Sequence, residues 1–267
     1  MLELKNIYKT FNPGTINEKR ALNGLNLKLN EGDFVTVIGG NGAGKSTMLN
    51  AVAGTWPVDE GQILIDNIDV TKLSEHKRAA YLGRVFQDPM TGTAGTMGIE
   101  ENLALAKRRG KARLLRPGIT KAEREEYKEL LKVLGLGLED RLTSKVGLLS
   151  GGQRQALTLL MATLQKPKLL LLDEHTAALD PGTAEKVLNL TKRIVEEHQL
   201  TCLMITHNMQ SALDLGNRIL MMDSGNIVLD IHEEEKKGLT VEGLLEKFKT
   251  GAGKMLDNDR ILLSGEK

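Results

Sequence analysis

The sequence has few of the features that mark secreted, disulfide-bonded or membrane-spanning proteins. Its 267 residues include a single cysteine, Cys202, so an internal disulfide is impossible and a reducing compartment is expected. Apolar runs such as residues 169–172 are far shorter than the roughly 20 residues that cross a bilayer. Met1, Leu2 and Glu3 do not begin a basic-then-apolar signal pattern. We therefore expect a soluble, cytoplasmic protein that meets any membrane through a partner.

An excess of charge of one sign is also lacking. Lysine and arginine total 36 against 35 for aspartate and glutamate, and the net charge of +1 gives no global attraction to nucleic acid or to an anionic surface. The local exception is residues 107–116, which carry six positive charges in ten residues. They form either a solvated loop, which is the simpler interpretation, or a segment attracted to lipid headgroups or to loops of a membrane partner, at about 1 kcal/mol per basic residue near the surface.

Hydrophobic periodicity predicts where the strands and helices lie. Leu2, Leu4, Leu25, Leu27 and Leu29 occupy alternate positions, which is typical of half-buried antiparallel strands. Further strands are expected at residues 34–38, 62–65, 82–86, 168–172 and 201–206, with a hairpin over 218–230. Helices are expected at residues 46–53, 100–109, 122–134, 156–164 and 183–198.

Two residue pairs mark the ends of these elements. Asp180 is placed to cap the helix over residues 183–198, and Pro181 follows it at a position where a missing N–H is harmless. Ser224 and Gly225 are expected to form the turn of the hairpin.

The order of the elements predicts the fold class. Strands that alternate with helices indicate an α/β protein with a mostly parallel sheet. We expect a core made of residues 1–87 and 153–230, with an antiparallel β subdomain at its N-terminus. Residues 88–152 are expected to form an inserted helical subdomain. Residues 231–267 are predicted to be a polar C-terminal extension, to which we assign no chemistry.

A glycine-rich loop between a predicted strand and a predicted helix carries the strongest functional signal. Residues 39–46 read GGNGAGKS and fit the pattern G-x-x-x-x-G-K-[ST]. Its glycines let backbone N–H groups surround phosphate oxygens at a helix N-terminus. Lys45 would neutralise the β- and γ-phosphates, and the Ser46 hydroxyl would bind Mg²⁺. The alternative is an ordinary glycine-rich turn. The predicted nucleotide-binding residues of this loop are Gly39, Gly40, Asn41, Gly42, Ala43, Gly44, Lys45, Ser46 and Thr47.

Two acidic residues follow a second apolar strand. Asp173 and Glu174 come directly after residues 168–172, at the carboxyl end where open α/β sheets bind ligands. Asp173 would hold Mg²⁺, directly or through water, and Glu174 would polarise the water that attacks the γ-phosphate. The alternative is that the two acids cap a helix.

A third motif connects these observations. Residues 149–155 read LSGGQRQ and lead into a predicted apolar helix, which gives a second anion-binding helix N-terminus. With this motif the sequence resembles an ABC-type ATPase, the nucleotide-binding subunit of a transporter, whose signature is LSGGQ. The resemblance extends over residues 2–230. It implies a RecA-like P-loop NTPase core with the two subdomains described above.

The resemblance also implies roles for individual residues. Phe11 matches the aromatic residue that stacks on adenine, although it could be a core residue and Tyr8 is a neighbouring alternative. Gln87 matches the glutamine that senses Mg²⁺ and the attacking water. His207 matches the histidine that contacts the γ-phosphate, and Asp180 matches the loop that crosses the dimer interface.

In this family two subunits pack head to tail around two ATP molecules. The signature residues of one chain then complete the phosphate site of the other chain. The residues concerned are Ser150, Gly151, Gly152 and Gln153.

The chain departs from the family pattern at two places. Gly40 stands where a proline is usual, and His175 and Ala177 replace the usual Pro and Ser after the catalytic glutamate. Neither change removes a phosphate, metal or water ligand. We expect His175 to be a packing or tuning residue and Cys202 to be a small core residue.

The resemblance predicts ATP hydrolysis with Mg²⁺ at the cytoplasmic face of the cell membrane, by a homodimer or by paired ATPase subunits. It implies separate transmembrane permease subunits, an extracytoplasmic substrate-binding protein, and import of an amino acid. One alternative is a soluble ABC ATPase that acts on nucleic acid or ribosomes, but such proteins carry long coiled coils or two ATPase units, and no nucleic acid partner is expected here. Another is a regulatory module without hydrolysis, against which Glu174 and His207 argue.

Overall fold

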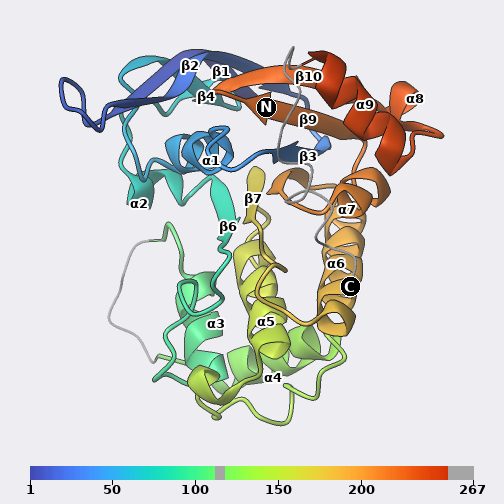
Figure 1. The fold of residues 1–267 in the computed structure, drawn as a ribbon. Helices are drawn as coiled ribbons and strands as arrows, with labels where there is room; N and C mark the ends of the chain where they lie inside the picture. Colours follow the sequence, from blue (N-terminus) through green and yellow to red (C-terminus); the bar gives the residue numbers. More distant parts are fainter. Residues whose placement is uncertain (112–117, 252–267) are drawn as a thin grey trace. The chain divides into compact units, whose positions relative to one another are not determined.

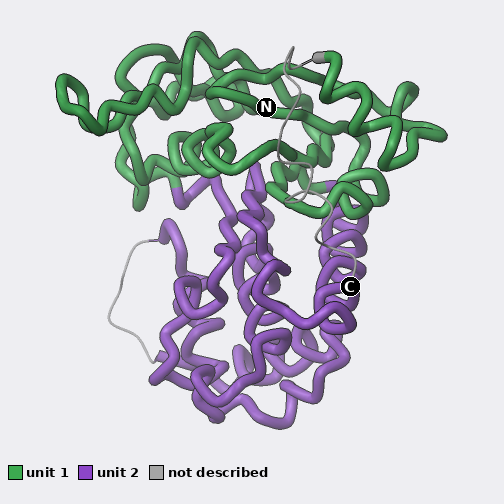
Figure 2. Tube along the Cα trace, viewed as in Figure 1, with its two compact units in different colours: residues 1–78, 200–267 green, residues 79–199 purple. Residues whose placement is uncertain are grey.

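The computed structural model describes residues 1–111 and 118–251 (Figure 1). The chain divides into two compact units (Figure 2). Unit 1 consists of residues 1–78 and 200–267, and unit 2 consists of residues 79–199. Unit 2 is therefore larger than the helical insertion expected at residues 88–152, because it also holds two strands and a long helix.

The first sheet of unit 1 is antiparallel, with strand order β2-β1-β4-β5. Its strands are β1 (Leu2–Phe11), β2 (Lys19–Leu29), β4 (Glu60–Ile65) and β5 (Ile68–Asp69). The five leucines at alternate positions are all buried, and Leu2 pairs with Leu29 while Leu4 pairs with Leu27. The predicted antiparallel strands are confirmed, since one face of the hairpin is apolar and covers the core.

Unit 1 also contains a mostly parallel set of strands in the order β10-β9-β3-β8. These are β3 (Phe34–Gly39), β8 (Thr201–Ile205), β9 (Arg218–Asp223) and β10 (Asn226–His232). Strand β3 lies parallel to both β8 and β9 and is buried along its whole length, as its β-branched composition predicts. Strands β9 and β10 form the predicted hairpin, and Ser224 and Gly225 turn it with φ values of 48° and 79°.

The helices of unit 1 are α1 (Lys45–Ala53), α2 (Glu75–Arg78), α7 (Met209–Asp214), α8 (Glu233–Lys236) and α9 (Val241–Gly251). A buried arginine anchors the C-terminus of α1. Arg78 donates to the carbonyl oxygens of Ala51 and Val52 at 2.6 and 2.9 Å, and also to those of Leu73 and Thr71. Positive charge at a helix C-terminus stabilises the last turn.

The C-terminal part of unit 1 differs from the expected polar extension. Leu244 and Phe248 of α9 are 0% and 1% exposed and pack in one cluster with Ile38, Met209 and Ile231. Residues 231–251 therefore contribute to the core, and the charged side chains of α9 lie on its other face. Residues 252–267 of the predicted extension lie outside the described residues.

Unit 2 combines two parallel strands with helices. Strands β6 (Leu82–Val85) and β7 (Leu169–Asp173) pair in parallel. Its helices are α3 (Ile99–Lys107), α4 (Lys121–Lys132), the 3₁₀ helix η1 (Val146–Leu148), α5 (Gly151–Thr163) and α6 (Pro181–Glu197). The predicted helices are confirmed within a few residues, except that α5 begins at Gly151 and not at residue 156. No helix within residues 1–111 and 118–251 is long and apolar enough to cross a membrane.

The basic segment over residues 107–116 lies partly outside the described residues, because 112–117 are not described. Where it is described, three of its basic side chains have partners within unit 2. Lys107 pairs with Glu126, Arg108 pairs with Glu123 at 3.2 Å, and Arg109 donates to the carbonyl oxygen of Ala162. These contacts reduce the charge that the segment can offer to another surface.

Candidate functional site

The glycine-rich loop joins β3 to α1, and its shape is fixed by close backbone contacts. A Cβ atom on Gly39 would overlap the carbonyl oxygen of Met222, and one on Gly44 would lie 2.6 Å from the carbonyl oxygen of Ala21. Both glycines have positive φ, 148° and 101°. Only glycine fits these two positions, so the loop is held in one conformation by its surroundings.

The N-terminus of α1 is arranged to bind an anion. Gly44 precedes the helix and gives no side-chain cap, so the N–H groups of the first turn are not used by a capping side chain. Lys45 is 5% exposed, and its ammonium group donates to the carbonyl oxygens of Gly39 and Gly40 at 2.7 and 3.0 Å. A positive charge thus lies on two backbone carbonyl groups of the loop, and the N–H groups of the first turn of α1 follow it, a combination that suits a phosphate group. Ser46, in the same first turn, is exposed.

The departure from the family pattern at Gly40 has no steric consequence in the structure. A Cβ atom on Gly40 would have no neighbour within 4 Å among the described residues, and its φ lies outside the left-handed region. The loop does not depend on glycine at this position.

The aromatic residue predicted to meet the nucleotide base lies at the end of β1. Phe11 is partly buried and packs edge-on against Trp56, with 5.0 Å between ring centroids. The ammonium group of Lys9 lies 5.6 Å from the centre of the Phe11 ring. Tyr8, the alternative, lies against Gly24 of β2. We did not predict Trp56, although a lone tryptophan shortly after the loop lysine is a signal that sequence reasoning could have used.

His207 follows the parallel neighbour of β3. The backbone N–H of Thr206 donates to the carbonyl oxygen of Val37 at 3.1 Å, so His207 leaves the sheet at the same edge as the glycine-rich loop. The next residue, Asn208, caps α7 by accepting from the N–H of Ser211 at 2.8 Å. The backbone on both sides of His207 is therefore held, and its side chain is exposed.

Unit 2 brings Gln87, Asp173 and Glu174 to the ends of two adjacent parallel strands. Asp173 ends β7, and one of its carboxylate oxygens lies 3.8 Å from the guanidinium of Arg84 on β6. Glu174 has a φ of 46°, which is uncommon for a residue with a side chain and costs about 1 kcal/mol or more. Backbone strain of this kind clusters at functional sites. Gln87 is exposed just beyond β6, next to Phe86.

His175, which follows Glu174, is buried and neutral. Its Nε2 lies 3.0 Å from the hydroxyl of Thr191, and that hydroxyl donates to the carbonyl oxygen of Val187. Nε2 of His175 is therefore the donor in the first bond. Burial lowers the pKa of His175 to about 4. These contacts confirm a packing role for His175 and remove it as an acid or base at neutral pH.

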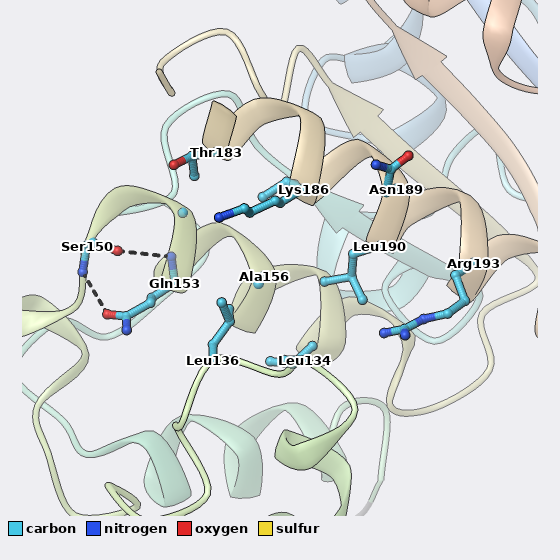
Figure 3. A pocket seen from close by; sticks show the side chains of 12 residues that line it. Leu134, Leu136, Ser150, Gln153, Ala156, Thr183, Lys186, Asn189, Leu190 and Arg193 are labelled. Carbon is cyan, nitrogen blue, oxygen red and sulfur yellow. Dashed lines mark hydrogen bonds between the residues drawn. The ribbon is translucent and has the colours of Figure 1, made fainter. Parts of the chain in front are cut away.

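The signature motif forms the first turn of α5. Ser150 is the N-cap: its hydroxyl accepts from the N–H of Gln153 at 3.3 Å, and the side-chain oxygen of Gln153 accepts from the N–H of Ser150 at 3.2 Å (Figure 3). This reciprocal pair is a capping box. In contrast to α1, the signature helix satisfies part of its own N-terminus.

A groove of about 580 Å³ lies beside the signature turn, between α5, α6 and the segment that follows α4 (Figure 3). Its lining is mostly apolar, with basic side chains at its edge. The lining residues are Leu134, Leu136, Ser150, Gly152, Gln153, Ala156, Thr183, Lys186, Val187, Asn189, Leu190 and Arg193. Asp180 caps α6, and its pKa is lowered by hydrogen bonds from the side chain and the backbone N–H of Thr183.

The predicted residues thus form two groups, one in each unit. Unit 1 holds the glycine-rich loop, Phe11 and His207, and unit 2 holds Gln87, Asp173, Glu174, the signature turn and Asp180. Most residues of each group lie just after the carboxyl end of a parallel strand or at the N-terminus of a helix. This is the arrangement expected of a phosphate-binding α/β protein.

Known proteins share both the sequence and the fold. The family model of ABC transporters matches residues 22–177. A tyrosine transport ATP-binding protein of Clostridioides difficile is 45% identical over 93% of this chain and 98% of its own length. A phosphonates import ATP-binding protein of Treponema denticola is 34% identical over 86% of this chain and 89% of its own length. A solved dimeric ATP-binding cassette, in a post-hydrolysis state with ADP and phosphate bound, has a TM-score of 0.74 and 33% identity, and the match covers 87% of this chain and 99% of that one.

Proposed function

We propose that this chain, which belongs to the ABC transporter family, is the ATP-hydrolysing subunit of an importer. We also propose that two copies of the chain share each nucleotide. One observation carries the proposal. The N-terminus of α1 has no side-chain cap, and the buried ammonium group of Lys45 lies directly beside it. Such a site suits the phosphates of ATP and has no other evident purpose.

In this proposal the residues of unit 1 bind the nucleotide. Backbone N–H groups of residues 40–46 surround the β- and γ-phosphates, and Lys45 neutralises them. Phe11 stacks on the adenine ring, with Trp56 supporting its edge. His207, which leaves β8 at the same edge as the loop, contacts the γ-phosphate.

Residues of both units have the chemistry to hold Mg²⁺. Ser46, Gln87 and Asp173 supply hydroxyl, amide and carboxylate oxygens, the ligand types that Mg²⁺ prefers. Mg²⁺ usually keeps several waters and is bound by one or two protein oxygens together with substrate phosphates. When bound, Mg²⁺ neutralises charge that develops on the phosphate oxygens.

Hydrolysis is assigned to residues of unit 2. Glu174, at its strained position after β7, polarises the attacking water, and Gln87 orients that water. The capping box of α5 presents Ser150 and Gly152 to the nucleotide of a second copy of the chain. The hydroxyl of Ser150 can still donate its hydrogen to a phosphate oxygen while it accepts from Gln153.

The partners follow from the same proposal. Two copies, or this chain and a related one, close around two ATP molecules at the cytoplasmic face of the membrane and move separate permease subunits. The relative named for tyrosine transport supports an amino acid as the solute. In the proposal, an extracytoplasmic binding protein delivers this solute. None of the relatives described above is named for nucleic acid or ribosomes, which favours transport over that alternative.

The test is ATP turnover in the assembled transporter. The chain, copurified with its permease subunits and placed in liposomes with Mg²⁺ and ATP, is expected to release phosphate faster when a binding protein loaded with tyrosine is added outside. Stimulation by DNA or ribosomes, with no response to any loaded binding protein, would replace transport with the alternative. Stimulation by another solute would retain import and correct the substrate.

A further inference from the structure

Both glycines of the signature turn lie against the segment that carries Asp180. A Cβ atom on Gly152 would overlap the Cγ2 methyl group of Thr183, while the Cβ and Oγ1 atoms of Thr183 would be 3.6 and 3.9 Å away. A Cβ atom on Gly151 would lie 3.2 Å from a methyl group of Leu179. At Gly152, the first turn of α5 therefore packs against the start of α6 through one methyl group.

The backbone of Gly152 does not itself require glycine. Its φ is not positive, and it lies in the first turn of a helix, where alanine is the more favourable residue. The only obstacle to a side chain at position 152 among the described residues is the methyl group of Thr183, since the other two nearest atoms are at ordinary contact distances.

Thr183 also holds Asp180, the N-cap of α6, in place. Its backbone N–H donates to the carboxylate of Asp180 at 3.0 Å, and its side chain contributes to lowering the pKa of that carboxylate. Thr183 thus touches Gly152 with its methyl group and Asp180 with its polar atoms.

We infer that Thr183 is a positioning residue that joins the signature turn to the loop of Asp180, so that both are presented to the partner copy as one rigid surface. The inference rests on the proposed function for its consequence in catalysis. It explains the need for glycine at position 152 by packing within one chain, in addition to the approach of a nucleotide that is bound to the other copy.

The test is a double-mutant cycle with Gly152→Ala and Thr183→Ser. The serine variant removes the methyl group and keeps the hydroxyl and the N–H that hold Asp180. We expect Gly152→Ala to lower kcat by about tenfold or more, because a misplacement near 1 Å at a catalytic surface has effects of this size. The KM for ATP is expected to stay within about twofold, since unit 1 binds the nucleotide.

The double variant decides the matter. Once Thr183→Ser has removed the methyl group, alanine at position 152 makes only ordinary contacts. The kcat is then expected to rise by about threefold or more above that of Gly152→Ala, while the approach of the partner's nucleotide to position 152 keeps it below that of Thr183→Ser alone. A double variant as inactive and as thermally unstable as Gly152→Ala would overturn the inference, because something other than Thr183 would then require the glycine.

A matched control and a second measurement separate this result from the proposed function. Gly182→Ala makes the same change at the start of α6, where the nearest atom to the new Cβ is 3.8 Å away, and it is expected to leave kcat unchanged. Thermal unfolding is the second readout: Gly152→Ala is expected to lower Tm in the native background and to raise it in the Thr183→Ser background. An equal shift in both backgrounds overturns the packing contact even if the native chain hydrolyses no ATP.

Discussion

Two helix N-termini in this chain carry anion-binding motifs, and they are built differently. Helix α1 begins after Gly44 with no capping side chain, and Lys45 places an ammonium group next to its first turn. Helix α5 begins with a capping box between Ser150 and Gln153, and the signature glycines fill the rest of its first turn. The first terminus depends on a ligand for its hydrogen bonds, whereas the second supplies some of them itself.

The comparison predicts which of the two helix N-termini contributes more to the affinity for ATP. An uncapped N-terminus beside a buried lysine gains much from a phosphate, because the N–H groups of its first turn meet no capping side chain and the ammonium group adds a charge-assisted hydrogen bond. A capped terminus gains less and serves to orient. We therefore expect the isolated chain to bind ATP through unit 1, with α5 contributing when a second copy presents it.

The largest expected effect separates nucleotide capture from turnover. Glu174→Gln leaves both helix termini intact but removes the group that polarises water, so kcat is expected to fall by about 10²- to 10⁴-fold with unchanged ATP affinity. Phosphate release and size-exclusion chromatography with ATP would show a dimer that does not turn over. Native rates in this variant would refute the role of Glu174.

The next effect concerns the other end of α1. Arg78 is 2% exposed and donates to four backbone carbonyl groups, two of them in the last turn of α1. Arg78→Met would remove a hydrogen bond from each of these carbonyl groups, of which that of Ala51 also accepts from the N–H of Gly54 at 3.2 Å, and is expected to cost about 3 kcal/mol of unfolding free energy. Chemical denaturation measures the loss. Arg78→Lys, which can reach fewer carbonyls, should give an intermediate value, and equal stability of all three chains would show that the anchor is unimportant.

A direct test of the affinity difference changes one charged and one polar residue. Lys45→Ala is expected to weaken ATP binding by about 2 to 3 kcal/mol, or roughly 30- to 150-fold, because a charged hydrogen-bond donor to phosphate is removed. Ser150→Ala is expected to leave binding by the isolated chain unchanged. Titration with a fluorescent ATP analogue measures both. Comparable losses in the two variants would mean that the termini contribute equally.

The smallest effect tests the cap itself. Ser150→Ala removes the N-cap of α5 and is expected to lower unfolding free energy by about 1 kcal/mol. The matched change on α1, Ser46→Ala, is expected to alter it by less than about 0.5 kcal/mol, since Ser46 is not the cap of its helix. Similar losses at both positions would remove the distinction between the two termini.

Much of this arrangement is readable from the sequence, because it is determined locally. The alternating leucines of β1 and β2 and the β-branched run of β3 predict their own burial. The glycine-rich loop is equally local, since Gly39 and Gly44 take conformations that other residues avoid.

Other features required contacts between distant residues. The early start of α5 is hidden by Gly151 and Gly152, which suggest a turn, although Ser150 and Gln153 have the spacing of a capping box. The prediction of a polar extension is wrong at α9, because its charged residues were given more weight than the spacing of Leu244 and Phe248, which marks one apolar face. The contact of Gly152 with Thr183 could not be predicted, because it depends on how two helices pack.

The central claim is that α1 of one chain and α5 of another act on the same ATP, and mixing two inactive variants tests it most directly. Lys45→Ala disables the first terminus, and Ser150→Arg blocks the second. A mixed pair then contains one site in which both termini are intact. The account predicts that the mixture releases phosphate although neither variant does so alone. A mixture as inactive as its components would contradict a site shared between two copies.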